Sequence, residues 1–107
     1  MIEISELEEF VKTYYREKDM MHNLSHIKRM LKAAKKLAKN YEIDEELIIY
    51  GAYLHGIIST NKREIIEFLK SKKISKERIE KIIKVAEESH IKEKPESIEG
   101  KILHDAH

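Results

Sequence analysis

Apolar residues recur along nearly the whole chain at steps of three and four positions, which is the spacing of one face of an α-helix. In the segment 24–38, for example, leucine, isoleucine, methionine and alanine alternate with lysine-rich positions. The pattern predicts six helices: one from Ser5, one over 24–38, one over about Glu45–Ile57, and three that open at Asn61, Ser75 and Ser97. We therefore expect an all-α fold.

Capping and breaking residues indicate where these helices begin and end. Ser5 with Glu8 three residues later matches a capping box, and Asp44 is typical of an N-cap. A polar stretch at 18–23 predicts the end of the first helix, and Pro95 predicts a break before the last one.

The length and composition fit one small domain. The chain has 107 residues, of which 41% are hydrophobic and 38% charged, so it can bury a modest core. Glycine is scarce and there is one proline, whereas a β-sandwich or barrel needs frequent turn residues. We predict a single compact bundle of five to six helices over residues 1–107.

Charge and cysteine content narrow the functional classes. Twenty-one basic and twenty acidic residues leave a net charge of +1, which gives no general field for nucleic acid. Cysteine is absent, which excludes disulfides and thiolate metal sites. No apolar run approaches the roughly 20 residues of a membrane span, and the N-terminus is too acidic for a secretory signal. We predict a cytoplasmic protein with no membrane partner, and the sequence gives no strong nucleic-acid signal.

Six histidines, at positions 22, 26, 55, 90, 104 and 107, carry most of the chemical information. His22 and His26 are four apart, a spacing that can bind a divalent metal but is also common on helix surfaces. His55 lies in the most apolar predicted helix, where a buried imidazole needs a partner. It is either a metal ligand or a core histidine hydrogen-bonded to a carbonyl group. His90 ends the fifth predicted helix, where the helix dipole alone favours an imidazolium.

Four segments, in order along the chain, resemble motifs of the HD superfamily of metal-dependent phosphohydrolases. The segment 22–30, His-Asn-Leu-Ser-His-Ile-Lys-Arg-Met, resembles the family's opening motif, and 52–57, Ala-Tyr-Leu-His-Gly-Ile, resembles Ala-x-Leu-His-Asp-Ile. The segment 82–90 is similar to the stretch that brings a further histidine near the site. The segment 99–107 resembles one that usually ends in Asp-Ala-Asp.

The resemblance implies an HD-like fold and a phosphohydrolase that acts on a nucleotide or another phosphate ester. It assigns His26, His55 and His107 as metal ligands, with His22 and His90 assisting catalysis. The implied cofactor is a divalent metal ion of the Mn, Ni, Co, Fe or Zn type, because imidazole suits magnesium poorly. Such an ion binds phosphate oxygens and lowers the pKa of a bound water, which can then attack phosphorus.

The sequence departs from the family pattern at two ligand positions. Gly56 stands where the family has the aspartate of its His-Asp pair, and His107 stands where the final ligand aspartate is expected. Glycine cannot coordinate a metal, and imidazole brings no negative charge. The chain also stops before the C-terminal helices that relatives of this type have, so an impaired metal site is expected. The alternative is a catalytically inactive HD fold that binds a phosphorylated small molecule or forms a homo-oligomer.

Overall fold

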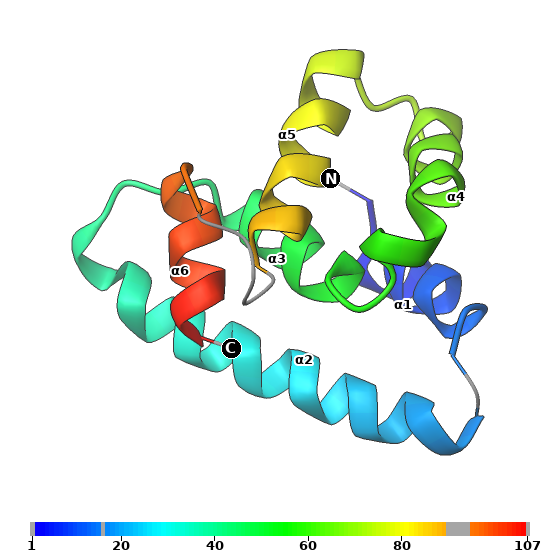
Figure 1. Cartoon of the computed structure of the whole chain (residues 1–107), viewed down its shortest axis with the longest axis horizontal. Helices are drawn as coiled ribbons and strands as arrows, with labels where there is room; N and C mark the ends of the chain where they lie inside the picture. The colour runs from blue at the N-terminus through cyan, green and yellow to red at the C-terminus, as the bar shows by residue number, and fades with distance from the viewer. Residues whose placement is uncertain (1, 16, 90–94, 107) are drawn as a thin grey trace.

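The structure is a computed structural model that describes residues 2–15, 17–89 and 95–106, with the backbone alone for 17–22 and 40 (Figure 1). Over these ranges it contains no strand and six α-helices. In order along the chain these are α1 (Ile4–Lys12), α2 (Glu17–Leu37), α3 (Glu45–Leu54), α4 (Ile58–Ser71), α5 (Lys76–Glu88) and α6 (Ile98–Ala106). A 3-10 turn, η1 (Ala38–Asn40), follows α2. The predicted all-α fold of five to six helices is confirmed. None of the helices in these ranges combines the length and the apolar character that a membrane span requires.

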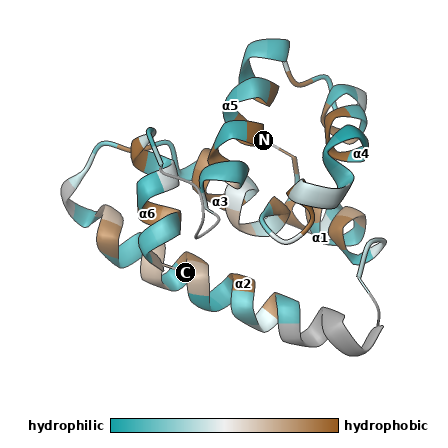
Figure 2. Cartoon of the chain, viewed as in Figure 1, coloured by the Kyte–Doolittle hydropathy of each residue, from teal (hydrophilic) through white to brown (hydrophobic). Residues whose placement is uncertain are grey.

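Helix α3 is the centre of the molecule because it is apolar on nearly every side. Seven of its ten residues are buried, and it packs against α1, α2, α5 and α6. The helices around it are amphipathic, and Figure 2 shows brown and teal positions alternating along α2 and α5. On α5, for example, Ile82 and Ala86 are buried while Lys81 and Lys84 are exposed. A helix that is hydrophobic all round belongs in a core, and amphipathic helices cover it.

Gly51 lets α3 lie very close to two other helices. A Cβ atom at this position would lie 2.5 Å from Cδ1 of Leu103 in α6 and 2.8 Å from Cγ1 of Val85 in α5. Both neighbours are buried, so a larger residue at position 51 would force the helices apart. This close packing fixes the end of α3 relative to the end of α5.

The starts of α1 and α2 differ from the sequence-based expectation. Helix α1 begins at Ile4 and Ser5 lies inside it, so the predicted capping box is wrong. Helix α2 begins at Glu17, so the polar stretch 18–23 forms its first turns instead of a break. That stretch contains no glycine or proline, and nothing in its backbone opposes a helix that packing stabilises further along.

Other helix starts follow the capping signals. The carboxylate of Asp44 caps α3 by accepting hydrogen bonds from the backbone N–H groups of Glu46 and Leu47. The hydroxyl of Ser75 caps α5 by accepting from the backbone N–H of Arg78. These short polar side chains satisfy N–H groups that have no partner within their own helix.

The chain turns sharply between α3 and α4. Helix α3 ends at Leu54 rather than at Ile57, and residues 55–57 form the turn. Helix α4 begins three residues before the predicted start, and Asn61 instead marks a kink within it, with φ −125° and ψ 31°. His55 therefore lies after the apolar helix and not inside it.

Glu88 is a buried carboxylate that joins the end of α5 to the start of α6. It accepts hydrogen bonds from the backbone N–H groups of Glu96 and Ser97 and from the Ser97 hydroxyl. Burial raises the pKa of Glu88, but these hydrogen bonds and the charge of Lys84 outweigh burial, and the pKa lies below its usual value. Glu88 is therefore held in its charged form.

We expect Glu88→Gln to lower the free energy of unfolding by about 1–3 kcal/mol near neutral pH, because a neutral amide accepts these hydrogen bonds less strongly. The pKa of Glu88 is depressed in the folded state, so its contribution is fully present above the ordinary value of 4.5. It is lost as the pH falls through the folded-state pKa. Urea unfolding across this range measures the difference, with exposed Glu80→Gln as the control. If the difference in the free energy of unfolding between wild type and Glu88→Gln stays constant as the pH falls below 4.5, this role of Glu88 is contradicted.

Candidate functional site

His26 and His55 are brought together from two helices. His26 is half-buried on α2, and His55 is the residue directly after the end of α3. The centroids of their rings are 6.4 Å apart and the ring planes are inclined by 44°. The two residues are far apart in the sequence, so their proximity results from the packing of α2 against α3.

His55 is oriented by a buried serine at the end of α5. The Nδ1 atom of His55 lies 2.7 Å from the Oγ atom of Ser89, and Ser89 is fully buried. The Ser89 hydroxyl donates its own hydrogen to the carbonyl oxygen of Ala86, at 2.6 Å. A serine hydroxyl has one hydrogen, so the bond between Ser89 and His55 must be donated by the imidazole.

This hydrogen bond selects the tautomer of His55. With Nδ1 protonated, the neutral ring carries its lone pair on Nε2. Metal-binding histidines commonly use the same arrangement, in which one ring nitrogen donates to a protein oxygen and the other binds the ion. Nε2 of His55 is therefore the atom that can bind a cation or accept a proton.

Tyr15 occupies the space beside Gly56. A Cβ atom on Gly56 would lie 1.9 Å from Oη of Tyr15 and 3.1 Å from its Cζ. The φ angle of Gly56 is not positive, so the backbone itself does not require glycine. A side chain at this position would meet the hydroxyl end of Tyr15, which would have to shift to make room for it.

The Tyr15 side chain reaches this position from the turn that follows α1. It is half-buried, and burial raises the pKa of its hydroxyl, which is therefore uncharged near neutral pH. Tyr15 was not among the predicted site residues, because nothing in the local sequence pattern connects it to a glycine so far along the chain. Ser89 was missed for the same reason, although it directly precedes the predicted site residue His90.

The side chains of the remaining predicted site residues lie outside the described part of the structure. His22 lies one turn before His26 in α2, but its side chain is outside the described part of the structure, and His90 and His107 are outside the described residues. Among the residues that are described, no group of three or more histidine and acidic side chains is arranged to hold a metal ion. Two of the three predicted metal ligands, His26 and His55, are thus close together.

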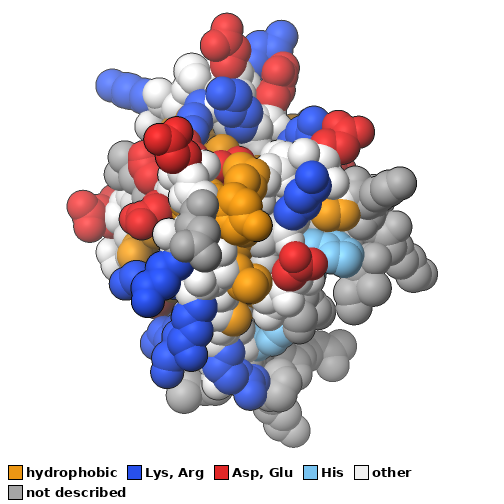
Figure 3. All heavy atoms as spheres, turned by 90° about the vertical axis from the view of Figure 1, so that its left-hand side faces the viewer, with side chains coloured by type: hydrophobic (Ala, Val, Ile, Leu, Met, Phe, Trp, Pro, Cys, Tyr) orange, Lys and Arg blue, Asp and Glu red, His pale blue; other side chains and the backbone are white. Residues whose placement is uncertain are grey.

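A cavity of about 870 Å³ lies away from the two histidines, between the end of α2, η1 and the start of α3. Its walls are mainly apolar, with residues such as Ala34, Ile43 and Ile48. On this side of the molecule apolar side chains form a strip between charged ones (Figure 3), and Leu37 and Tyr41 are exposed. None of the predicted site residues lines this cavity.

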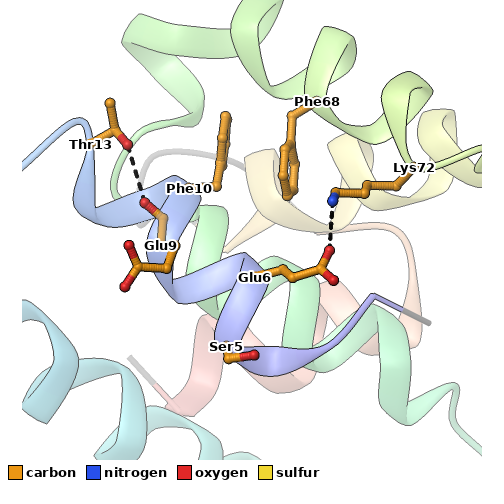
Figure 4. A pocket seen from close by; sticks show the side chains of 7 residues that line it. All are labelled: Ser5, Glu6, Glu9, Phe10, Thr13, Phe68 and Lys72. Atoms are coloured by element: carbon orange, nitrogen blue, oxygen red, sulfur yellow. Dashed lines mark hydrogen bonds and ion pairs between the residues drawn. The ribbon is translucent and has the colours of Figure 1, made fainter.

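A shallow groove between α1 and α4 is also separate from the histidines (Figure 4). The rings of Phe10 and Phe68 stack beside it with their centroids 4.0 Å apart. At one end, Lys72 forms an ion pair of 2.7 Å with Glu6. These contacts hold α1 against α4, which makes the groove a feature of helix packing.

Comparisons of the chain with protein-family models, with curated proteins and with solved structures gave no match.

The contact between Tyr15 and Gly56 makes a direct prediction about stability. We expect Gly56→Ala to destabilise the protein by about 1–3 kcal/mol, because the added methyl group must displace the Tyr15 ring. In a Tyr15→Ala background the same change should cost little, since the obstacle is gone. A double-mutant cycle from urea unfolding measures this coupling, and a Tyr14→Ala background is the matched control. Equal costs of Gly56→Ala in all three backgrounds would rule out the contact.

Proposed function

We propose that this chain is an HD-type phosphohydrolase-like protein that binds a nucleotide or another phosphate ester at the His26–His55 pair. The observation that carries the proposal is the 6.4 Å separation of the two imidazole rings. They come from two of the four segments that resemble the family, the opening motif at 22–30 and the motif at 52–57. The resemblance and the geometry thus point to the same two residues, and the expected cytoplasmic location is part of the proposal.

The environment of His55 supports a chemical role. Ser89 is buried, holds Nδ1 of His55, and so leaves the lone pair of the neutral ring on Nε2. A histidine oriented in this way can bind a cation or move a proton at one defined atom. In the proposal, Ser89 is the positioning residue and His55 contacts the ligand.

The described residues fit a divalent metal ion only in part. Two imidazoles on one tetrahedral zinc ion place their ring centroids about 5 Å apart, so His26 and His55 must approach by about 1 Å to share an ion. The third proposed ligand, His107, lies outside the described residues. A bound ion of the Mn, Ni, Co, Fe or Zn type supplies an activated water and offsets phosphate charge.

The second candidate is a catalytically inactive HD-like domain that binds a phosphorylated molecule or a second copy of itself. The position of Tyr15 favours it, because the phenol fills the space that a carboxylate at position 56 needs. The exposed Leu37 and Tyr41 support the version in which the domain forms a homo-oligomer.

Hydrolysis of a generic phosphomonoester and phosphodiester, with Mn, Ni, Co or Zn added, tests the enzyme version. We expect metal-dependent turnover that falls at least about tenfold in His26→Ala and in His55→Ala, because each removes one metal ligand. Ser25→Ala, an exposed change on α2, is the control and should retain the wild-type rate.

Titration of the same proteins with a phosphate ester separates the two candidates. Ligand binding without turnover in any metal supports the inactive domain. The proposal is overturned if the wild type shows no turnover and no ligand binding. It is also overturned if His55→Ala turns over and binds the ligand like the wild type.

A further inference from the structure

Two large apolar side chains are exposed next to each other where α2 ends. Leu37 is the last residue of α2 and Tyr41 follows η1, and they are 43% and 57% exposed. In the described part of the chain one other large hydrophobic side chain is as exposed, that of Ile4 on α1. Figure 3 shows that the apolar side chains on this side of the molecule form a strip and are not scattered singly. A continuous apolar strip of this kind is typical of a contact surface.

Two hollows border Tyr41. The cavity of about 870 Å³ between α2, η1 and α3 has mainly apolar walls, in which Ala34 and Ile48 are buried. A smaller hollow of about 360 Å³ is lined by Leu37 and by residues of α6 such as Ile102. Tyr41 lines both hollows, so an exposed aromatic side chain stands beside apolar space that it does not fill. A surface that has both an exposed apolar group and an apolar hollow can pack against a copy of itself.

The charged residues around the larger cavity form two sets of opposite sign. Lys35 on α2 and Lys39 in η1 are positive, whereas Glu42, before α3, and Glu45, its first residue, are negative. All four side chains are exposed, and within the described residues none of them forms an ion pair. The four charges sum to zero, so this surface offers no net attraction to a nucleic acid or an anionic membrane.

A two-fold axis turns the same charges into complementary pairs. The lysines come from the α2 side of the cavity and the glutamates from the α3 side. In a symmetric dimer the same patch is used by both copies, so the α2 side of one copy can face the α3 side of the other. Lysines then lie opposite glutamates twice, and the apolar strips meet between them. A patch of one sign would instead repel its own copy.

We infer that this patch is a dimerisation surface that binds a second copy of the chain about a two-fold axis. We call it the Tyr41 surface; it consists of Leu37, Tyr41 and the two hollows beside them. The inference rests on the homo-oligomer version of the second candidate function and gives that version its surface. Ligand binding at the histidine pair does not depend on it, because neither histidine lines the two hollows.

The first test measures self-association by sedimentation and light scattering over a range of protein concentrations. We expect the wild type to dimerise, and Leu37→Ser and Tyr41→Ser each to raise the dissociation constant at least about tenfold, because each removes a central apolar contact. Ile4→Ser is the matched control, since Ile4 is 44% exposed and lies on α1. It should dimerise like wild type. Circular dichroism checks that each variant is folded.

The second test reverses one set of charges at a time. The double variant Lys35→Glu with Lys39→Glu makes all four positions acidic, and Glu42→Lys with Glu45→Lys makes all four basic. Each should dimerise at least about tenfold more weakly than wild type, because like charges then face each other. An equal mixture of the two should form the mixed dimer at least as well as wild type, which native mass spectrometry measures. Only a contact between copies across this surface predicts recovery on mixing.

Three outcomes would overturn the inference. The first is a wild type that stays monomeric at every concentration; if its cavity then binds the apolar dye anilinonaphthalene sulfonate, the surface is a small-molecule site instead. The second is a dimer that Leu37→Ser and Tyr41→Ser weaken no more than Ile4→Ser does. The third is a mixture of the charge variants that associates no better than either variant alone.

The histidine site and the dimer can fail separately. His55→Ala should dimerise like wild type, because His55 is not part of the Tyr41 surface. A monomeric wild type that binds or hydrolyses a phosphate ester overturns this inference alone. A dimer through the Tyr41 surface that neither binds nor hydrolyses a phosphate ester supports the inference and overturns the ligand-binding versions of the proposed function.

Discussion

The close packing of α3 at Gly51 is the constraint on which the rest of the arrangement depends. Because a side chain is missing there, α3 lies against Val85 of α5 and Leu103 of α6 at distances that a Cβ atom would not allow. This contact sets the register between the ends of α3 and α5. This register brings Nδ1 of His55, the residue after α3, to 2.7 Å from Oγ of Ser89, the residue after α5.

The candidate site is therefore a consequence of how the helices end. His55 follows α3, Ser89 follows α5, and Tyr15 follows α1, while His26 lies within α2. The hydrogen bond from His55 to the buried Ser89 joins the turn after α3 to the end of α5, although both residues lie outside regular helix. A buried serine that orients an imidazole is more than packing needs, because an apolar residue would fill the same space without a polar group to satisfy.

Much of the fold could be predicted from the sequence, because helix periodicity and caps are local signals. The helices, the caps at Asp44 and Ser75 and the apolar character of α3 all follow from short patterns. The start of α2 could not be read in this way, since packing further along the helix outweighs a polar start. The proximity of His26 and His55 was expected from the resemblance of 22–30 and 52–57 to HD-superfamily motifs, which assigns both residues to one metal site. Tyr15 and Ser89 carry no local signal, because only tertiary packing brings them to the site.

The central claim is that Ser89 fixes His55 with its Nδ1 protonated, which leaves Nε2 as the unprotonated nitrogen of the neutral ring. Long-range proton–nitrogen NMR on imidazole-labelled protein, at a pH of about 8.5 where an ordinary imidazole is neutral, measures this directly. We expect the Nδ1–H tautomer in the wild type and a mixture of tautomers in Ser89→Ala. An Nε2–H tautomer in the wild type, or no change in Ser89→Ala, would contradict the account.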